Sequence, residues 1–204
     1  MKTLFITFTL LLYAVSATGQ NQVEATKIVF LGDSLTAGYG VNIEEAYPSL
    51  LRNQLKAENY IISVVNSGIS GSTSASGPSR MKWLLKGNPD IVLLALGAND
   101  GLRGQDTENM KDNLRSTINL ALDQGCKVLL AGMRMPTNYG EEYTNRFYQV
   151  YLDLAKEFNI PFIPFLLKDV GGVRKYNLAD GLHPNAAGHK IIAKNVIKYL
   201  QPLL

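Results

Sequence analysis

Five short, continuous apolar runs divide the chain, and longer segments of mixed apolar and polar residues separate them. The runs are Ile28–Leu31, Ile61–Val65, Ile91–Leu96, Val128–Ala131 and Pro161–Pro164. They begin roughly 30 to 37 residues apart, a spacing typical of successive βαβ units. Runs without alternation are typical of strands covered on both faces of a parallel sheet. We therefore expect five parallel strands.

The segments between these runs carry apolar residues at helical spacing. The clearest faces are formed by Phe147, Val150, Tyr151, Leu154, Ala155 and Phe158, and by Met110, Leu114, Ile118 and Ala121. Shorter patterns predict a helix over Tyr47–Leu55 and a last helix that begins at Asn185 as its N-cap. We expect these stripes to belong to the core. Without a repeat or a long linker, the pattern predicts one three-layer α/β domain.

Composition agrees with a single globular domain. Of the 204 residues, 46% are apolar and 18% are charged, which is ordinary for a globular protein. The formal net charge of +3 is spread without a long Lys/Arg block, so nucleic acid is not an expected partner. Cys126 is the single cysteine, which excludes an internal disulfide. We expect it to be a small buried hydrophobe rather than a nucleophile.

The first residues have the pattern of a secretory signal peptide. Met1 and Lys2 form a short basic start, residues 3–15 are mainly apolar, and Ser16–Gly19 are small. The apolar stretch is short for a membrane span. We expect a signal peptide over residues 1–19, with cleavage after Ala17 or Gly19, and a mature domain over residues 20–204. The mature protein is then periplasmic or secreted, and an uncleaved anchor is the alternative.

Residues suited to catalysis follow four of the five predicted strands. Ser34 follows the first run, Asn66–Gly71 follow the second, Gly97–Asp100 follow the third, and Asp180 and His183 come after the fifth. In open α/β sheets, ligands bind beyond the carboxyl ends of the strands. We therefore expect these residues to converge there.

The chemistry of these residues fits nucleophilic catalysis by a serine. A serine hydroxyl is a weak nucleophile until a base takes its proton, and an imidazole held by a carboxylate performs that task. Ser34, His183 and Asp180 are the expected nucleophile, base and orienting carboxylate. The N–H groups of Ser34 and Gly71 and the side-chain amide of Asn99 are the expected oxyanion donors.

Each of these motifs taken alone also fits a simpler structural role. Gly-Asp-Ser and Asn-Asp-Gly are common turn sequences, and Asp-x-x-His fits the start of a helix. We expect Asp33 and Asp100 to orient loops through backbone hydrogen bonds, and His189 to be a surface or packing residue. The chain has no Gly-x-Ser-x-Gly elbow, phosphate loop or dinucleotide fingerprint. With two histidines and one cysteine, a zinc site is poorly supported.

The order of these segments resembles the conserved blocks of the SGNH hydrolases, also called the GDSL esterase/lipase family. Ser34, Gly71, Asn99 and His183 match the four residues that name the family, and Asp180 matches its third triad member. The resemblance runs across essentially the whole mature chain. It is greatest to bacterial periplasmic members that combine acyl-CoA thioesterase, arylesterase and lysophospholipase activities.

This resemblance implies a flavodoxin-like sheet with strand order 2-1-3-4-5, no metal or cofactor, and a mobile segment over Gly101–Gln105. Two regions depart from the family members it resembles most. Ser72 stands where they carry an acidic residue, and the stretch between Leu166 and Leu178 differs. Neither departure touches the matched triad, but both bear on the preferred acyl chain.

The expected function is therefore that of an exported serine esterase. It would hydrolyse aryl or alkyl esters or lysophospholipids through an acyl-enzyme, with thioesters as a further expected substrate. Leu102, Met135, Pro136 and Tyr139 are the expected lining of an acyl groove. The alternatives are a carbohydrate O-deacetylase of the same family and a catalytically inactive lipid- or glycan-binding module.

Overall fold

A computed structural model of the protein describes residues 24–204. The expected signal peptide, residues 1–19, lies outside these described residues. Within residues 24–204, none of the helices is both long and apolar enough to cross a bilayer.

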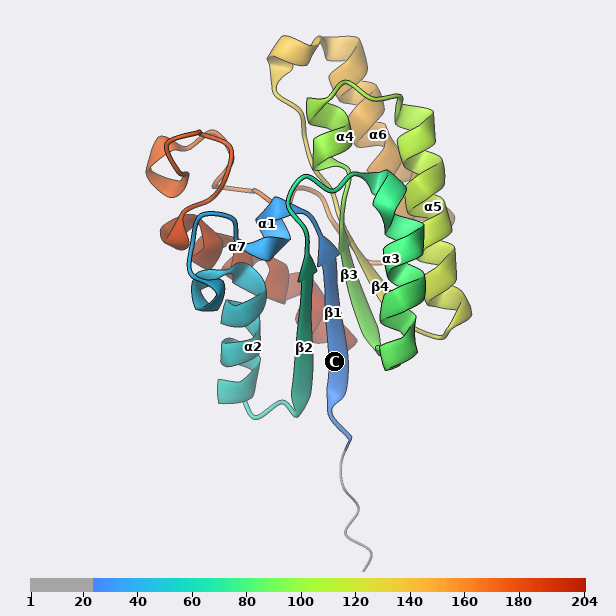
Figure 1. The fold of residues 1–204 in the computed structure, drawn as a ribbon, viewed down its shortest axis with the longest axis vertical. Helices are drawn as coiled ribbons and strands as arrows, with labels where there is room; N and C mark the ends of the chain where they lie inside the picture. Colours follow the sequence, from blue (N-terminus) through green and yellow to red (C-terminus); the bar gives the residue numbers. More distant parts are fainter. Residues whose placement is uncertain (1–23) are drawn as a thin grey trace, which may run out of the picture.

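A five-stranded parallel sheet forms the centre of the fold (Figure 1). Its strands are β1 (Thr26–Gly32), β2 (Ile62–Gly68), β3 (Ile91–Ala95), β4 (Lys127–Ala131) and β5 (Phe162–Ile163). Their order in the sheet is β2-β1-β3-β4-β5. The five expected strands and the flavodoxin-like order are thus confirmed.

Helices cover both faces of this sheet. They are α1 (Ser34–Ala37), α2 (Tyr47–Ala57), α3 (Gly77–Leu84), α4 (Ala98–Leu102), α5 (Thr107–Asp123), α6 (Glu141–Glu157) and α7 (Ala186–Leu200). Short 3-10 turns lie at η1 (Ile43–Glu45), η2 (Ser74–Ser76), η3 (Leu85–Gly87), η4 (Thr137–Tyr139), η5 (Arg174–Tyr176) and η6 (Gln201–Leu203). Helices α2 and α7 pack together on one face, and α3, α5 and α6 pack in a row on the other (Figure 1). This is the three-layer arrangement that the pattern predicts.

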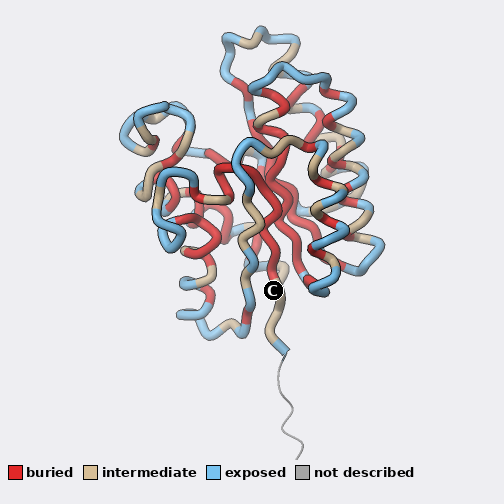
Figure 2. Tube along the Cα trace, in the orientation of Figure 1, coloured by how far each residue is buried: buried red, intermediate tan, exposed pale blue. Residues whose placement is uncertain are grey.

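The core lies between these layers, along β1, β3 and β4 (Figure 2). The predicted helical stripes face it: Met110, Leu114, Ile118 and Ala121 of α5 are buried, as are Phe147, Val150, Tyr151 and Leu154 of α6. Asn185 caps α7, and its side chain accepts a hydrogen bond from the N–H of Gly188 at 3.1 Å. The predicted cap is confirmed.

The expectation that every strand is covered on both faces is wrong for β2. Ile61, just before this strand, is 55% exposed and Val65 within it is 43% exposed. Strand β2 is an edge strand, since it pairs only with β1. Helix α2 covers one face of β2, whereas α3 on the opposite side packs against β1. The apolar run thus overstates how much of this edge is buried.

Candidate active site

Ser34 lies at a sharp turn that joins the buried strand β1 to helix α1. Asp33 caps this short helix, because its carboxylate accepts the N–H of Leu35 at 3.0 Å. A side chain at Gly32 would overlap the hydroxyl of Thr36, so the strand can turn here only with a glycine. The turn places Ser34, which is 8% exposed, at the carboxyl edge of the sheet.

His183 and Asp180 reach Ser34 from the loop that follows β5. The Nε2 atom of His183 lies 2.9 Å from Ser34 Oγ, and its Nδ1 atom lies 2.7 Å from Asp180 Oδ2. Since a carboxylate only accepts, Nδ1 carries a proton and Nε2 is left to accept the hydroxyl of Ser34. The structure thus brings these three predicted residues into one hydrogen-bonded chain.

The turn that carries Asp180 also fixes its charge. Its Oδ1 atom accepts the N–H groups of Leu182 and His183 at 2.9 and 3.0 Å. Gly181 allows this tight turn with a φ of 71°. The hydrogen bond from the His183 N–H, then the one from its ring, lower the pKa of Asp180 to about 2. Asp180 is therefore a carboxylate at neutral pH.

The expected oxyanion donors lie on the other side of Ser34. Gly71 follows β2 with a φ of 77°, and Asn99 is in the first turn of α4. The Asn99 amide donates to the Ser72 carbonyl at 3.0 Å and approaches Asp33 Oδ2 at 3.4 Å. The guanidinium of Arg103 donates to the Gly71 carbonyl at 3.0 Å. These bonds hold the Gly71 loop against α4.

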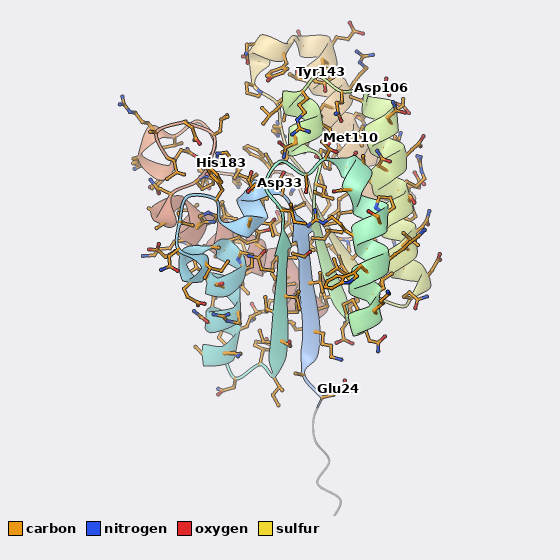
Figure 3. All side chains as sticks on the ribbon, viewed as in Figure 1. Glu24, Asp33, Asp106, Met110, Tyr143 and His183 are labelled. Carbon is orange, nitrogen blue, oxygen red and sulfur yellow. The ribbon has the colours of Figure 1, made fainter. Side chains whose placement is uncertain are left out.

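Two buried carboxylates order the loops around these donors, as the sequence predicts. Asp33 is 1% exposed, and its burial raises its pKa to about 6. Figure 3 shows Asp33 and His183 at this end of the molecule. Asp100 accepts the N–H and the hydroxyl of Ser74 at 2.8 and 2.5 Å, which ties α4 to the segment after β2.

An apolar cavity of about 520 Å³ opens beside Ser34. Ser34, Asn99 and His183 form its polar end, and the expected residues Leu102, Met135 and Pro136 line it. Further lining residues that the sequence reasoning missed are Met133, Arg134, Phe165, Leu167 and Leu182. Phe165 and Leu167 follow the fifth apolar run, and Leu182 directly precedes His183. These positions at the carboxyl edge of the sheet could have indicated that the three residues lie near the site.

Tyr139 is the one expected groove residue that lies outside the cavity lining. Its hydroxyl donates instead to the carbonyl of Leu102 at 3.0 Å. It therefore supports the groove from behind, through the backbone of a lining residue. Tyr143, in the first turn of α6, donates to the carbonyl of Gln105 at 2.9 Å, beyond the residues that line the cavity.

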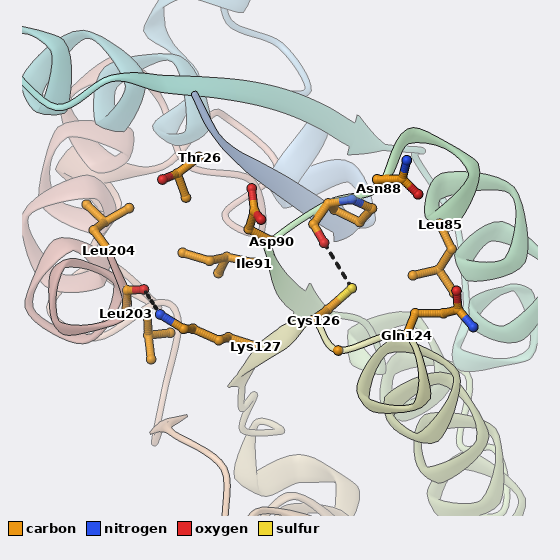
Figure 4. Close-up of a pocket in the computed structure, with 12 residues that line it drawn as sticks. Thr26, Leu85, Asn88, Asp90, Ile91, Gln124, Cys126, Lys127, Leu203 and Leu204 are labelled. Atoms are coloured by element: carbon orange, nitrogen blue, oxygen red, sulfur yellow. Dashed lines mark hydrogen bonds between the residues drawn. The ribbon is translucent and has the colours of Figure 1, made fainter. Parts of the chain in front are cut away.

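The remaining candidate nucleophile and base lie away from this site. Cys126 lines a second cavity of about 370 Å³ beside the first residues of β3 and β4 (Figure 4). Its thiol donates to the Pro89 carbonyl, and burial raises its pKa. His189 is 1% exposed in α7, where its Nδ1 accepts the N–H of Tyr47. Burial lowers the pKa of His189 to about 4, so both residues are packing residues.

Comparison with known proteins places this geometry in a family. Residues 30–191 match the model of the GDSL-like Lipase/Acylhydrolase family. Esterase TesA of Pseudomonas aeruginosa is 40% identical over 184 residues, which cover 90% of this chain and 92% of that protein. Thioesterase 1/protease 1/lysophospholipase L1 of Escherichia coli is 39% identical over 181 residues, covering 88% and 86% of the two chains.

A solved structure agrees with these matches. The psychrotrophic esterase EstA from Pseudoalteromonas sp., inhibited by monoethylphosphonate, has a TM-score of 0.83 and 31% identity. The similarity covers 87% of this chain and 97% of EstA. The chain therefore belongs to the GDSL-like lipase/acylhydrolase family and is a carboxylic ester hydrolase.

Proposed function

We propose that this hydrolase works through a serine nucleophile, with Ser34, His183 and Asp180 as its triad. The hydrogen-bonded chain from Asp180 through His183 to Ser34 Oγ, with links of 2.7 and 2.9 Å, is the observation that carries the proposal. It has the order and the reach that proton transfer from a serine requires.

In the first half of the reaction, Ser34 Oγ attacks the ester carbonyl and His183 Nε2 takes its proton. His183 then gives this proton to the departing alcohol, which leaves an acyl group on Ser34. In the second half, His183 takes a proton from water as the water oxygen attacks the acyl carbonyl. The bond between the acyl carbon and Ser34 Oγ then breaks, the carboxylic acid leaves, and His183 returns the proton to Ser34 Oγ. Asp180 stabilises the imidazolium that forms in both halves.

Negative charge on the carbonyl oxygen is held by the N–H groups of Ser34 and Gly71 and by the amide of Asn99. In the structure this amide donates to the carbonyl of Ser72 at 3.0 Å and reaches the carboxyl of Asp33 at 3.4 Å. We expect the oxyanion to replace the neutral Ser72 carbonyl as an acceptor of the Asn99 amide. Charge-assisted hydrogen bonds are about twice as strong as neutral ones, so this exchange would favour the transition state.

The substrate class follows from the cavity beside Ser34. Its lining is mainly apolar, with Leu102, Met135 and Phe165 among its walls. Burial of an acyl chain contributes about 0.8 kcal/mol for each CH₂ group. We therefore propose esters with an alkyl acyl chain, lysophospholipids included, rather than acetyl groups on a sugar. The relative named thioesterase 1/protease 1/lysophospholipase L1 supports this choice and adds thioesters to it.

The location of the reaction is part of the proposal. The basic start, apolar stretch and small residues of positions 1–19 support export and removal of this segment. Residues 20–204 would then act as one domain in the periplasm or outside the cell. Acyl esters and lysophospholipids are among the substrates that an exported enzyme can meet in the cell envelope.

The direct test replaces Ser34 with alanine and measures hydrolysis of a chromogenic medium-chain ester. Loss of the nucleophile is expected to lower kcat by about 10⁵-fold or more, since removal of a triad member leaves only residual catalysis. Ser79→Ala, on the exposed surface of α3, is the matched control and should keep full activity. A fluorophosphonate should label the wild-type chain and not Ser34→Ala. Activity in Ser34→Ala equal to wild type would overturn the proposed mechanism.

The same assay over a series of esters tests the substrate class. We expect kcat/KM to rise from acetyl to medium-chain esters, because each added CH₂ group is buried against the cavity wall. Highest activity on acetylated glycans, with none on longer esters, would favour the deacetylase instead.

A further inference from the structure

The aromatic ring of Tyr39 lies against the ring of His183. The two ring centroids are 4.5 Å apart and the ring planes are inclined by 43°. The side chain of Tyr39 is 52% exposed, so only about half of its surface is buried. The contact with the ring of His183 accounts for part of that buried surface.

The backbone around Tyr39 holds this contact in place. The N–H of Tyr39 donates to the carbonyl of Ser34 at 3.1 Å, so the turn that carries the serine also carries the tyrosine. Gly38 and Gly40 flank it with φ values of 78° and 76°, a conformation that other residues rarely adopt. A side chain at Gly40 would overlap Leu178, so this segment packs directly on the loop that bears His183.

The hydrogen bonds of His183 leave one motion of its ring weakly restrained. Its two nitrogens bond to Asp180 and Ser34 in the plane of the ring. These bonds fix the ring within its plane, but they resist tilting about the line that joins the two nitrogens only weakly. A contact on the face of the ring opposes that tilt, and Tyr39 supplies one.

The same contact favours the charged form of the imidazole. When His183 takes the proton of Ser34 it becomes a cation, and a cation within about 6 Å of an aromatic centroid is attracted to the ring. The carboxylates near this cation are Asp180 on its own loop and Asp33 beyond Ser34. The ring of Tyr39, with its centroid 4.5 Å from that of His183, adds to their attraction.

We propose that Tyr39 is a positioning residue for His183, whose ring keeps the imidazole aligned with Ser34 and stabilises the imidazolium formed during attack. This inference rests on the proposed triad. It predicts that the aromatic ring matters for the chemical step, and that the hydroxyl of the tyrosine does not.

Three variants separate these contributions: Tyr39→Phe, Tyr39→Leu and Tyr39→Ala. Tyr39→Phe keeps the ring and should retain kcat within about twofold of wild type. Tyr39→Leu keeps apolar cover but loses the π face, so kcat should fall roughly two- to fivefold, with KM unchanged. Tyr39→Ala also frees the tilt, and its kcat should fall by about tenfold or more.

Two further readouts test whether the effect runs through His183. Inactivation by a fluorophosphonate also needs His183 to take the Ser34 proton, so its rate should fall by the same factor as kcat. The ring protons of His183 should shift in the proton NMR spectrum of Tyr39→Leu, a change easily followed in a chain with two histidines. Trp83→Leu, which removes an aromatic ring that is 68% exposed on α3, is the control and should change neither.

The outcomes distinguish this inference from the proposed function. If Ser34→Ala abolishes activity but Tyr39→Leu and Tyr39→Ala keep the wild-type kcat, the inference fails and the triad stands. A rise in KM at constant kcat would also overturn it, because Tyr39 would then contact substrate. If Ser34→Ala remains active, the proposed triad fails and the inference fails with it.

Discussion

Asp33 and His189 are buried ionisable residues whose effects on stability oppose each other. Burial raises the pKa of Asp33 from 3.8 to about 6. The folded state therefore binds a proton at Asp33 more tightly than the unfolded state does. Its contribution to stability is fully present below pH 3.8 and is lost as the pH rises through about 6. The loss is about 3 kcal/mol, at 1.36 kcal/mol for each pH unit of the shift.

His189 acts with the opposite sign. Burial lowers its pKa from 6.5 to about 4, so the unfolded state binds the proton more tightly. The stability contributed by neutral His189 is present above pH 6.5 and is lost as the pH falls through about 4. This loss is also about 3 kcal/mol. Between about pH 4 and 6, where both residues titrate, the two contributions to the free energy of unfolding largely cancel in the wild-type protein.

Replacing either residue alone should therefore make the free energy of unfolding depend on pH over this range. In Asp33→Asn the contribution of His189 is no longer offset by that of Asp33, and the free energy of unfolding should fall by about 3 kcal/mol as the pH drops from 6.5 to 4. In His189→Gln the contribution of Asp33 is no longer offset, and the same free energy should rise by about 3 kcal/mol as the pH drops from 6 to 3.8. Urea unfolding over this pH range measures both. Parallel pH curves for the two variants would contradict this assignment.

At the scale of elements, α4 and the residues after it connect the oxyanion side of the site to the rest of the fold. Asn99 is in its first turn, and Arg103 at its end bonds to the Gly71 carbonyl. The strand ends and the motifs that match the family could be predicted from the sequence, because both are local patterns of residues. The sequence did not show which tyrosines of η4 and α6 hold the α4 segment. Tyr139 was therefore expected in the groove itself, although it bonds to the backbone of Leu102.

The hydrogen bond from Arg103 should matter for the chemical step. Arg103→Met removes the donor to the Gly71 carbonyl and leaves the Asn99 bond to the Ser72 carbonyl to hold this loop against α4. The Gly71 N–H is then less firmly positioned, and we expect kcat to fall about three- to tenfold with little change in KM. This is a fraction of the 10²–10³ that complete loss of an oxyanion donor costs. Steady-state kinetics on a short-chain ester measure the effect. Arg146→Met, on the exposed surface of α6, is the matched control, and an equal loss in both variants would argue against a specific role.

At the scale of the whole molecule, the site depends on two segments far apart in sequence. Ser34 follows the first strand, whereas His183 belongs to a long loop between β5 and α7 that contains only the short turn η5. The side chain of Asn177 donates to the carbonyls of Val170 and Val173 at 2.7 and 2.9 Å and so anchors this loop. Motif order predicted that Asp180 and His183 reach Ser34. Nothing local identified Asn177, because its partners are backbone carbonyls of irregular structure.

Removal of this anchor tests how far the loop depends on it. Asn177→Ala removes two hydrogen bonds to carbonyls that then keep only their backbone donors, and we expect the free energy of unfolding to fall by about 1–3 kcal/mol. We also expect kcat to fall, because the loop also carries Asp180 and His183. Thermal unfolding and ester hydrolysis measure the two effects. Asn53→Ala, on the exposed surface of α2, should change neither, and wild-type behaviour of Asn177→Ala would show that other contacts hold the loop.

The two edge strands of the sheet, β2 and β5, differ in a way that bears on self-association. Strand β5 has only two residues and is flanked by Pro161 and Pro164, which have no N–H to offer a further strand. Strand β2 has seven residues and carries the exposed side chain of Val65. Edge strands of this second kind are templates for intermolecular pairing. Within residues 24–204, aggregation by strand addition is therefore directed to the β2 side, where a single charged residue in place of Val65 would oppose it.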